Sequence, residues 1–474
     1  MYRKSRIPLT VIFVVFAVLA FAALFRNYIH IYSEEYEIEA MCHAGGGIYK
    51  KCAICSKEVC VEKTPPAGHK GVWITREEPT AATFGERELR CSVCKQQMDL
   101  IKLSPSETVF PSIYIKGSGE GMTEKNPVTV NFKYNDTIKK TETEGKTAIR
   151  LMNYAPDYNI KHSYVLLNFN NSGIDEKPFG EYNNLSELYL FAAKDDYTRS
   201  RSIVADTQWI DLVADAHPEY YSFLKVSDEL IYKGENILFY LNANNRDYVY
   251  AGTFTKRLPY GEFVKNFDDD RVVSVIKQST IQGNPIFSLA YGEPEKYQQN
   301  LDSLKEFLSL SDVTVSDRTD INLLIDYCAY ALLTDNYDAY TSLYWISPDG
   351  YKWYPLMYDN EYIYGSKPNT TAISSHEYLT DVFGIWKTVY TLYHNKICNT
   401  ALDFASGRLS INNVKNDFER TVSKLTDDVY EAEAKVYKIQ YLSPHSEIEK
   451  IVQWYGKRID FVKDMRTDGG VYFE

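Results

Sequence analysis

The stretch that decides the predicted fold is LLTDNYDAYTSLYWISPDGYKWYPLMYDNEYIYG, residues 332–365. Its first residues complete an apolar pattern with i, i+3 and i+4 spacing, which predicts a helix that ends at Thr334. Two strand-like runs follow, and Ser347-Pro-Asp-Gly350 between them has the composition of a tight turn, so we predict a β-hairpin. The hairpin returns the chain toward the polar turn 335–338, and residues 358–361 are expected beside that turn.

Three acidic side chains are expected to gather where the hairpin returns. Asp338 lies in the polar turn, and Asp359 and Glu361 are two positions apart at the end of the second strand. Such oxygen ligands suit a hard cation. In phosphoryl transfer, one Asp serves the acceptor hydroxyl while others hold Mg²⁺ against the nucleotide. Two alternatives stay open: the first turn caps a helix while YDNEY is an exposed acidic turn, or Asp338 and Glu361 serve a hydrolase.

The residues on either side of this stretch predict an α+β protein. From about Val109, short alternating runs bounded by Gly, Asn and Asp predict antiparallel strands. Gly117-Ser-Gly-Glu-Gly121 lies between two such runs, so we interpret it as a hairpin turn and not as a phosphate-binding loop. Helical patterns dominate after Lys296. We therefore predict a sheet lobe over residues 106–290 and a helical lobe with the inserted hairpin over residues 291–474.

The hairpin resembles the CotH kinase family, named for spore coat protein H. The family pattern is roughly N-x-D-aromatic, a strand pair, and W-D-x-D-x-x-x-G. It is similar to NYDAY from Asn336 and to YDNEYIYG from Tyr358. Other similar segments follow in the family's order between Val109 and Met465, namely VFPSIYIKGSGEG, NIKHSYVLLNF, LFAAKDDYTRSRS and EIEKIVQWYGKRIDFVKDM.

The resemblance implies a divergent, kinase-like fold of two lobes and ATP-dependent phosphorylation of a surface or coat protein. It implies that Asp338 is the catalytic Asp. It also implies that Asp359 and Glu361 are ligands of Mg²⁺ or Mn²⁺, and that Lys161 and Arg201 contact the phosphates. This chain departs from the family pattern at Glu361, which replaces an Asp. It also departs at Leu258, which lies where an acidic partner for a phosphate-binding Lys is expected. A catalytically inactive scaffold or adhesion protein with the same fold is the alternative.

Six of the eight cysteines lie between residues 42 and 94. Among them are two CxxC motifs, and two such turns supply the four thiolates of a tetrahedral Zn²⁺ site. We predict one structural zinc site made by Cys52, Cys55, Cys91 and Cys94. Disulfides that include Cys42 and Cys60 are the alternative. The remaining two cysteines, Cys328 and Cys398, have apolar neighbours and are predicted to be buried free thiols.

The cysteine segment also contains an internal repeat. GGIYKKCAICSK from Gly46 aligns with GERELRCSVCKQ from Gly85, 39 positions later. We predict a small β-hairpin with one CxxC turn in each copy, in a zinc-ribbon-like module over residues 40–105. The module resembles short Cys-rich repeats of Gram-positive surface proteins. His69 is close enough in sequence to be a further donor, but we interpret it as a turn residue because it is isolated and follows a glycine.

The N-terminal residues predict where the chain lies relative to a membrane. Residues 7–25 carry no charge, and a helix of that length spans about 28 Å, roughly one hydrocarbon core. Basic residues precede this run and acidic residues follow it. This predicts a cytoplasmic tail over residues 1–6, a single-pass transmembrane anchor over 7–25 and an extracytoplasmic body at the cell membrane. A signal peptide cleaved near Ala20-Phe-Ala22 is the alternative.

The charge and hydrophobic content of the chain restrict the classes of molecule that it can bind. Among 474 residues, 52 are basic and 64 are acidic, which gives a net charge of −12. Without a basic field to attract phosphate backbones, general nucleic-acid binding is excluded. Hydrophobic residues make up 45% of the chain, as is typical of folded proteins. We expect a protein substrate or a surface partner, together with the membrane.

Overall fold

The computed structural model describes residues 8–28, 30–80, 84–103, 110–136, 141–152, 161–167, 186–193, 196–226, 231–242, 248–266, 271–281, 284–336, 338–358, 360, 362–366 and 384–467. The chain divides into two compact units. The N-terminal unit contains Met1–Pro79 and Phe84–Ser104, and the C-terminal unit contains Thr80–Thr83 and Pro105–Glu474.

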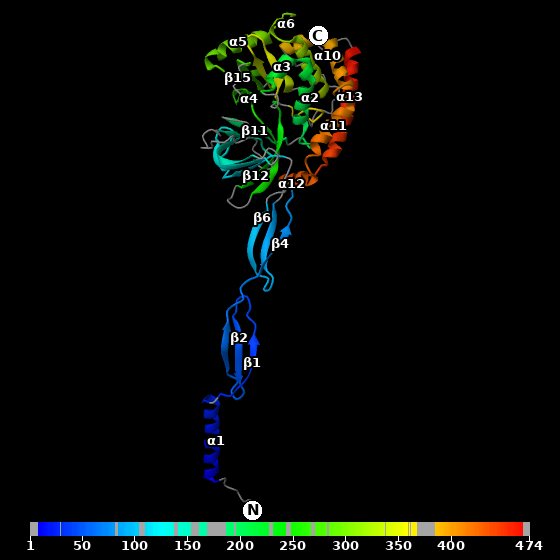
Figure 1. Ribbon diagram of the computed structural model, residues 1–474. Coiled ribbons are helices and arrows are strands. Elements are labelled where there is room, and N and C mark those ends of the chain that lie inside the picture. The colour runs from blue at the N-terminus through cyan, green and yellow to red at the C-terminus, as the bar shows by residue number, and fades with distance from the viewer. Residues whose placement is uncertain are drawn as a thin grey trace, which may run out of the picture. The chain divides into compact units, whose positions relative to one another are not determined.

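The N-terminal unit contains two small antiparallel sheets of the same design (Figure 1). We call them the first and second ribbons. The first ribbon has the strand order β1-β2-β3 and the second has the order β4-β5-β6. Every strand of the second ribbon begins 39 positions after its counterpart, which confirms the predicted repeat. The strands are β1 (Tyr32–Ile38), β2 (Gly46–Cys52), β3 (Glu58–Thr64), β4 (Gly71–Glu77), β5 (Gly85–Cys91) and β6 (Gln97–Leu103).

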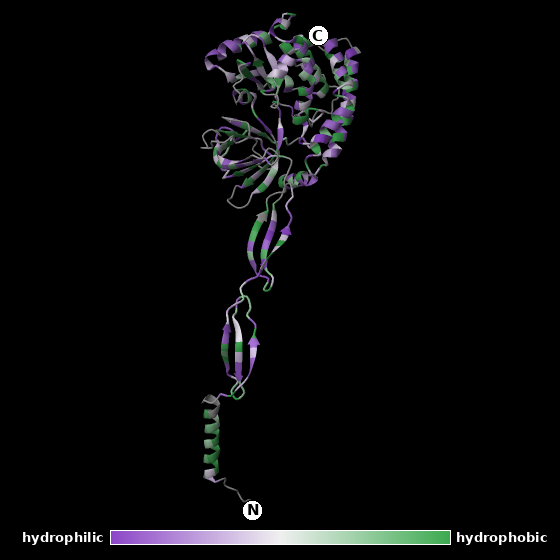
Figure 2. Ribbon diagram, in the orientation of Figure 1, coloured by the Kyte–Doolittle hydropathy of each residue, from purple (hydrophilic) through white to green (hydrophobic). Residues whose placement is uncertain are grey.

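Neither ribbon buries enough apolar surface to form a substantial core. All seven residues of β4 are exposed, and so are six of the seven residues of β1. Hydrophilic and hydrophobic residues are mixed along the strands of both ribbons (Figure 2). Three short strands without a covered face are marginal by themselves, so another interaction has to stabilise each ribbon.

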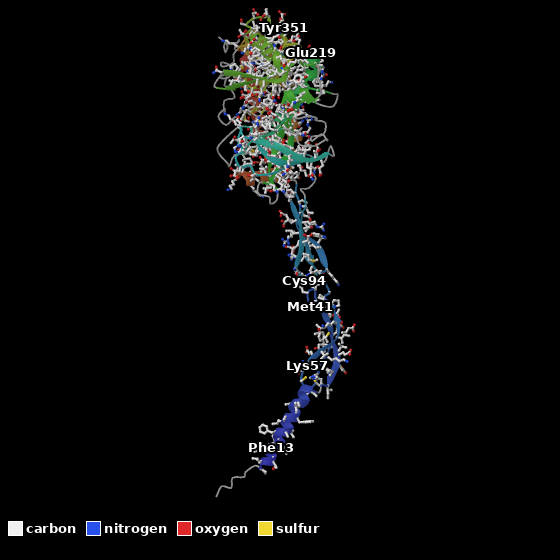
Figure 3. All side chains as sticks on the ribbon, turned by 90° about the vertical axis from the view of Figure 1, so that its left-hand side faces the viewer. Phe13, Met41, Lys57, Cys94, Glu219 and Tyr351 are labelled. Atoms are coloured by element: carbon white, nitrogen blue, oxygen red, sulfur yellow. The ribbon has the colours of Figure 1, made fainter. Side chains whose placement is uncertain are left out.

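The N-terminal helix differs from the predicted anchor. α1 (Leu9–Tyr28) begins two residues after the predicted start, and Phe13 projects from it (Figure 3). Its uncharged part, residues 9–25, has 17 residues, at the short end of the range of about 17–25 residues for a span. Across the residues that the structure describes, no helix is both long and apolar enough to traverse a bilayer. This finding contradicts the predicted transmembrane anchor, the membrane partner and the single-pass membrane localisation.

The C-terminal unit begins with a closed barrel of strand order β10-β11-β13-β12-β7-β8-β9. Neighbouring strands are antiparallel except β12 and β7, and the pairing of β9 with β10 closes the barrel. Apolar side chains such as Ile113, Phe132, Leu190 and Phe239 fill it. The strands are β7 (Ser112–Lys116), β8 (Val128–Asp136), β9 (Thr141–Leu151), β10 (Tyr164–Leu167), β11 (Glu187–Phe191), β12 (Glu235–Asn242) and β13 (Val249–Arg257).

The barrel corrects the predicted fold class. Alternating residues identify strands, but whether the first and last strands of a sheet meet depends on register, tilt and stagger, which no local pattern records. The α+β content is as expected, while the predicted kinase-like fold of an antiparallel sheet lobe and a helical lobe is wrong. Kinase activity therefore draws no support from the fold.

A second sheet, of order β15-β14-β16-β17, contains the predicted hairpin. β16 pairs with β17 in the register Leu343↔Met357 to Ile346↔Tyr354, which confirms the hairpin. The boundary that we predicted between residues 290 and 291 falls inside one of its strands. The strands are β14 (Ser274–Ile281), β15 (Asn284–Gly292), β16 (Leu343–Ser347) and β17 (Tyr354–Met357).

Helix α7 lies at the centre of the helical part. Eleven of its fourteen residues are buried, and α10 and α13 pack against it. A helix that is apolar on nearly all sides needs such a cover. The helices are α2 (Arg201–Ala216), α3 (Pro218–Phe223), α4 (Tyr260–Asn266), the 3-10 helix η2 (Pro294–Lys296), α5 (Tyr297–Leu308), α6 (Val315–Arg318), α7 (Ile321–Thr334), α8 (Asp338–Thr341), α10 (Ile385–Ser406), α11 (Ile411–Val422), α12 (Asp427–Tyr437) and α13 (Pro444–Thr467).

Candidate functional site

The polar turn after α7 is positioned by the end of that helix. Asp335 adopts a left-handed conformation with φ of 60°, which stops the helix, and its carboxylate lies 3.4 Å from Arg458. Asp338 is the first residue of α8 and is half-buried. The Ala339 N–H donates to the Asn336 side-chain oxygen over 3.2 Å, which fixes the turn between the two helices.

The loop that follows β17 lies directly against this turn. The Asn336 Nδ2 donates to the Asn360 Oδ1 over 2.7 Å. The Tyr364 N–H donates to the Thr334 carbonyl over 2.8 Å. The hairpin therefore brings the two segments together, as the sequence predicts. Asp359 and Glu361, the residues on either side of Asn360, lie outside the described residues.

A line of buried polar groups leads from this loop into the barrel. The Asn360 Nδ2 donates to Asp206 on α2 over 3.1 Å. Asp206 also accepts from the Gly234 N–H over 2.9 Å and forms an ion pair with Arg257 on β13. No sequence motif points to Asp206 and Arg257, which are 51 positions apart. Their pairing positions the loop through contacts that only the folded chain makes.

Arg201 is 1% exposed and is surrounded by protein acceptors. Its guanidinium donates to the Ile363 and Tyr364 carbonyls over 2.7 and 2.9 Å. It also lies 2.8 Å from Glu447 and 3.4 Å from Asp196. All of these contacts are with protein groups, and two of them hold the backbone just after residue 361. Arg201 thus positions the loop.

Lys161 belongs to a second buried ion cluster. Its Nζ donates to the Glu433 Oε1 over 3.0 Å and also to the Thr253 carbonyl. Glu433, on α12, further accepts from Arg199 over 2.7 Å and from the Thr253 N–H over 2.8 Å. Burial by itself would raise the pKa of Glu433, but Lys161, Arg199 and the Thr253 N–H together lower it below its ordinary value. Glu433 is therefore a carboxylate at neutral pH.

Glu433 is the acidic partner of Lys161 that the family pattern places at position 258, where this chain has Leu. An acidic partner for Lys161 is present, but it comes from α12, 272 positions away, and not from the segment after Gly252. No local signal identifies it. Gly252 nevertheless matters, because a Cβ there would lie 2.9 Å from the Lys161 Cε and 3.1 Å from the Glu433 Oε2.

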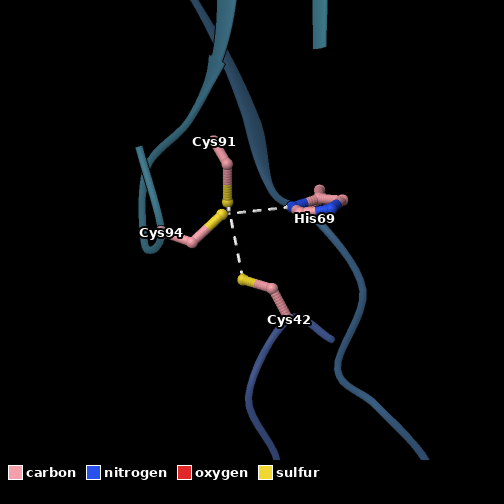
Figure 4. Close-up of side chains that lie close together, drawn as sticks. All are labelled: Cys42, His69, Cys91 and Cys94. Carbon is pink, nitrogen blue, oxygen red and sulfur yellow. Dashed lines mark hydrogen bonds between the residues drawn. The ribbon is translucent and has the colours of Figure 1, made fainter. Parts of the chain in front are cut away.

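The four predicted zinc ligands do not form one site. Cys52 and Cys55 group with His30, whereas Cys91 and Cys94 group with His69 and Cys42 (Figure 4). The single Cys₄ site is therefore wrong, because each CxxC turn belongs to a separate ribbon. His69, interpreted as a turn residue, lies with its Nδ1 3.4 Å from the Cys94 Sγ. His30 and His69 are 39 positions apart, so the repeat itself was the signal that would have identified both.

The other cysteines lie outside these groups. Cys60 is on β3 and is half-buried. Cys328 and Cys398 are buried and free, as predicted. Burial raises the pKa of the Cys398 thiol to about 11, which keeps it protonated and unreactive at neutral pH.

No family model and no curated protein sequence matches this chain. The resemblance to the CotH family thus stays a prediction from the motifs.

Proposed function

We propose that the C-terminal unit transfers a phosphoryl group from ATP, with Mg²⁺ or Mn²⁺, to a hydroxyl group of a protein. The observation that carries this proposal is the 2.7 Å hydrogen bond between Asn336 and Asn360. It joins the turn that contains Asp338 to the loop whose residues 359 and 361 are acidic. The proposal rests on this local arrangement and not on the fold.

The chain's own groups have separate tasks in such a reaction. Asp338 accepts the proton from the acceptor hydroxyl as that oxygen forms its bond to the γ-phosphorus and the bond to the ADP oxygen breaks. Asp359 and Glu361 would hold the metal ion, because carboxylates are donors that Mg²⁺ accepts. A bound metal ion neutralises charge on the nucleotide phosphates. Asn336 and Asn360 hold the two acidic segments in register.

The buried ion cluster fits this proposal at one further point. In protein kinases, the Lys that contacts the nucleotide phosphates is held by an ion pair with a Glu. Lys161 and Glu433 form such a pair at 3.0 Å. The Glu433 carboxylate also binds Arg199 and the Thr253 N–H, so it is fixed at several points.

Calorimetric titration of ATP into the full chain, with and without Mg²⁺ or Mn²⁺, tests the proposal. We expect metal-dependent binding that is lost in Asp359→Asn. Asp338→Asn should keep nucleotide binding but lose transfer of labelled phosphate to a protein acceptor. Asp460→Asn, at an exposed carboxylate on α13, is the matched control. Absence of binding at millimolar ATP in the folded protein would contradict the proposal.

A second candidate function is a scaffold or adhesion protein without transfer activity. The observation that favours it is the burial of Lys161 and Arg201, which are 5% and 1% exposed and are paired with protein groups. Because Glu433 and Glu447 already neutralise these two cations, they attract the phosphates of a nucleotide more weakly. Under this hypothesis, ATP leaves the thermal unfolding temperature unchanged both with and without metal.

A further inference from the structure

The two ribbons place a histidine and two cysteines at equivalent positions. The His30 Nδ1 lies 3.1 Å from the Cys55 Sγ, and the His69 Nδ1 lies 3.4 Å from the Cys94 Sγ. In both cases the histidine precedes the first strand of its ribbon, and the CxxC turn connects the second and third strands. Each ribbon therefore supplies three soft or borderline donors to one point.

The backbone arranges both CxxC turns in the same way. In the second ribbon, the Cys91 N–H donates to the Gln96 carbonyl over 2.9 Å, and the Lys95 N–H donates to the Cys91 carbonyl over 3.0 Å. In the first ribbon, the equivalent hydrogen bonds link Cys52 with Lys57 and Ser56, each over 2.9 Å.

The residue that closes each turn has a left-handed conformation. The φ angle is 64° at Lys95 and 59° at Ser56. Non-glycine residues seldom adopt such angles without a compensating constraint.

The second group has a fourth donor, which comes from the first ribbon. Cys42 lies in the connection between β1 and β2, is 7% exposed, and has its Sγ 3.6 Å from the Cys91 Sγ. Neighbouring contacts hold this connection against the second ribbon. The His43 Nε2 donates to the Gln96 Oε1 over 2.8 Å, and the His43 ring meets the His69 ring edge-on at 4.5 Å between centroids.

We propose that Zn²⁺ binds to Cys42, His69, Cys91 and Cys94, and that this ion fastens the first ribbon to the second. All four donor atoms lie within 4.8 Å of one another. Zinc–ligand bonds of about 2.3 Å to sulfur and 2.0 Å to nitrogen, at tetrahedral angles, imply sulfur–sulfur and sulfur–nitrogen separations of about 3.8 and 3.5 Å. The observed Cys42–Cys91 and His69–Cys94 separations of 3.6 and 3.4 Å agree with these values.

The donor set favours zinc, and the separation of Cys42 and Cys91 does not correspond to a disulfide between them. Three thiolates and an imidazole are a soft, four-coordinate set that suits zinc and not Mg²⁺ or Ca²⁺. A disulfide needs sulfur atoms about 2.05 Å apart, whereas Cys42 and Cys91 are 3.6 Å apart. A zinc ion also supplies the cross-link that a three-stranded sheet without a core requires.

The first group is predicted to bind zinc more weakly. Among the described residues, it consists of His30, Cys52 and Cys55. The position that precedes Cys42 by one repeat is occupied by arginine, at residue 3, and not by cysteine. Within the described part of the chain, the second group thus has four ligands, one of them from the first ribbon, whereas the first group has three.

Titration of Co²⁺ and then Zn²⁺ into the full, reduced, metal-free chain tests this proposal. We expect one tight site with the absorption of a tetrahedral, three-thiolate centre. Cys42→Ser should weaken that site by at least about 100-fold, since removing even outer-shell partners of a metal costs 10–100-fold. Cys60→Ser is the matched control and should leave the affinity unchanged. Equal affinities of Cys42→Ser and Cys60→Ser would overturn the assignment.

A second measurement keeps the proposal testable if Cys42→Ser fails to fold. Alkylation of the wild-type chain, followed by mass spectrometry, reports which thiols the metal protects. We expect Zn²⁺ to protect Cys42, Cys91 and Cys94 while Cys60 reacts, and a chelator to remove that protection. Equal labelling of Cys42 with and without zinc, or a Cys42–Cys91 disulfide in the chain as isolated, would overturn the proposal.

Discussion

Lys161 and Glu433 are 272 positions apart in the sequence, and their charged atoms lie 3.0 Å apart in the buried part of the C-terminal unit. Arg199 shares the same carboxylate at 2.7 Å, so one buried acid pairs with two buried bases. This arrangement connects the barrel strand β13, through Thr253, to helix α12. Removing Glu433 would leave two positive charges in a place that water does not reach.

Glu433→Gln is expected to lower the free energy of unfolding by about 3–5 kcal/mol, because Lys161 and Arg199 would stay buried without their counter-charge. Denaturant unfolding at pH 7 measures the change. Glu431→Gln, at an exposed position on the same helix, is the matched control and should be neutral within about 0.5 kcal/mol. Equal stability of the two variants would show that the cluster does not hold α12 in place.

Gly252→Ala is expected to disturb the same cluster from the opposite side. Gly252 has φ of 131°, and an added Cβ would lie 2.9 Å from the Lys161 Cε. The strained backbone alone costs about 1–3 kcal/mol, and the displaced lysine adds to this loss. Thermal unfolding compared with Gly119→Ala, where the nearest atom to a Cβ is 3.8 Å away, measures the effect. A Gly252→Ala chain as stable as the control would contradict the prediction.

Asn360→Ala is expected to separate the loop after β17 from the turn after α7. The substitution removes one buried hydrogen bond from Asn336 and one from Asp206, and each such loss costs about 1–3 kcal/mol. Urea unfolding compared with Asn412→Ala, at an exposed position of α11, gives the stability change. Metal-dependent ATP binding should fall in the same variant if the proposed function holds. Unchanged stability would mean that the Asn336–Asn360 bond contributes little.

His217 is expected to make stability depend on pH. Its ring donates to Asp320 over 2.9 Å and to Asp326 over 2.8 Å. Burial by itself would lower its pKa, but the two carboxylates raise the pKa of His217 from 6.5 to about 9. A group with a raised pKa stabilises the folded chain fully below pH 6.5, and this contribution is lost as the pH rises through 9.

Unfolding free energies measured from pH 6 to 10 test this effect. We expect the wild type to lose on the order of 1–2 kcal/mol across that window, after allowance for solvent screening. His217→Gln should lack this decline, while His445→Gln, at an exposed position of α13, should keep it. An identical pH profile in wild type and His217→Gln would rule out His217 as its source.

Local patterns predicted those features that depend on neighbouring residues. Ser347-Pro-Asp-Gly350 carries its own turn chemistry, so the hairpin and the approach of Asn360 to Asn336 followed from the sequence. The 39-residue repeat determined two ribbons with equivalent strands. The same repeat contained the signal for His30 and His69, although we interpreted His69 as a turn residue.

Features that need residues far apart in the sequence were decided by the tertiary structure alone. The pairing of β9 with β10 closed the barrel, because register and tilt, and not alternation, determine whether two strand edges meet. Glu433 reached Lys161 from α12, and Cys42 reached Cys91 from the other ribbon, because burial and packing select partners without regard to sequence separation. The sequence by itself thus determined the turns, strands and repeat. The ligands and counter-charges that complete each site depended on which surfaces the folded chain brings together.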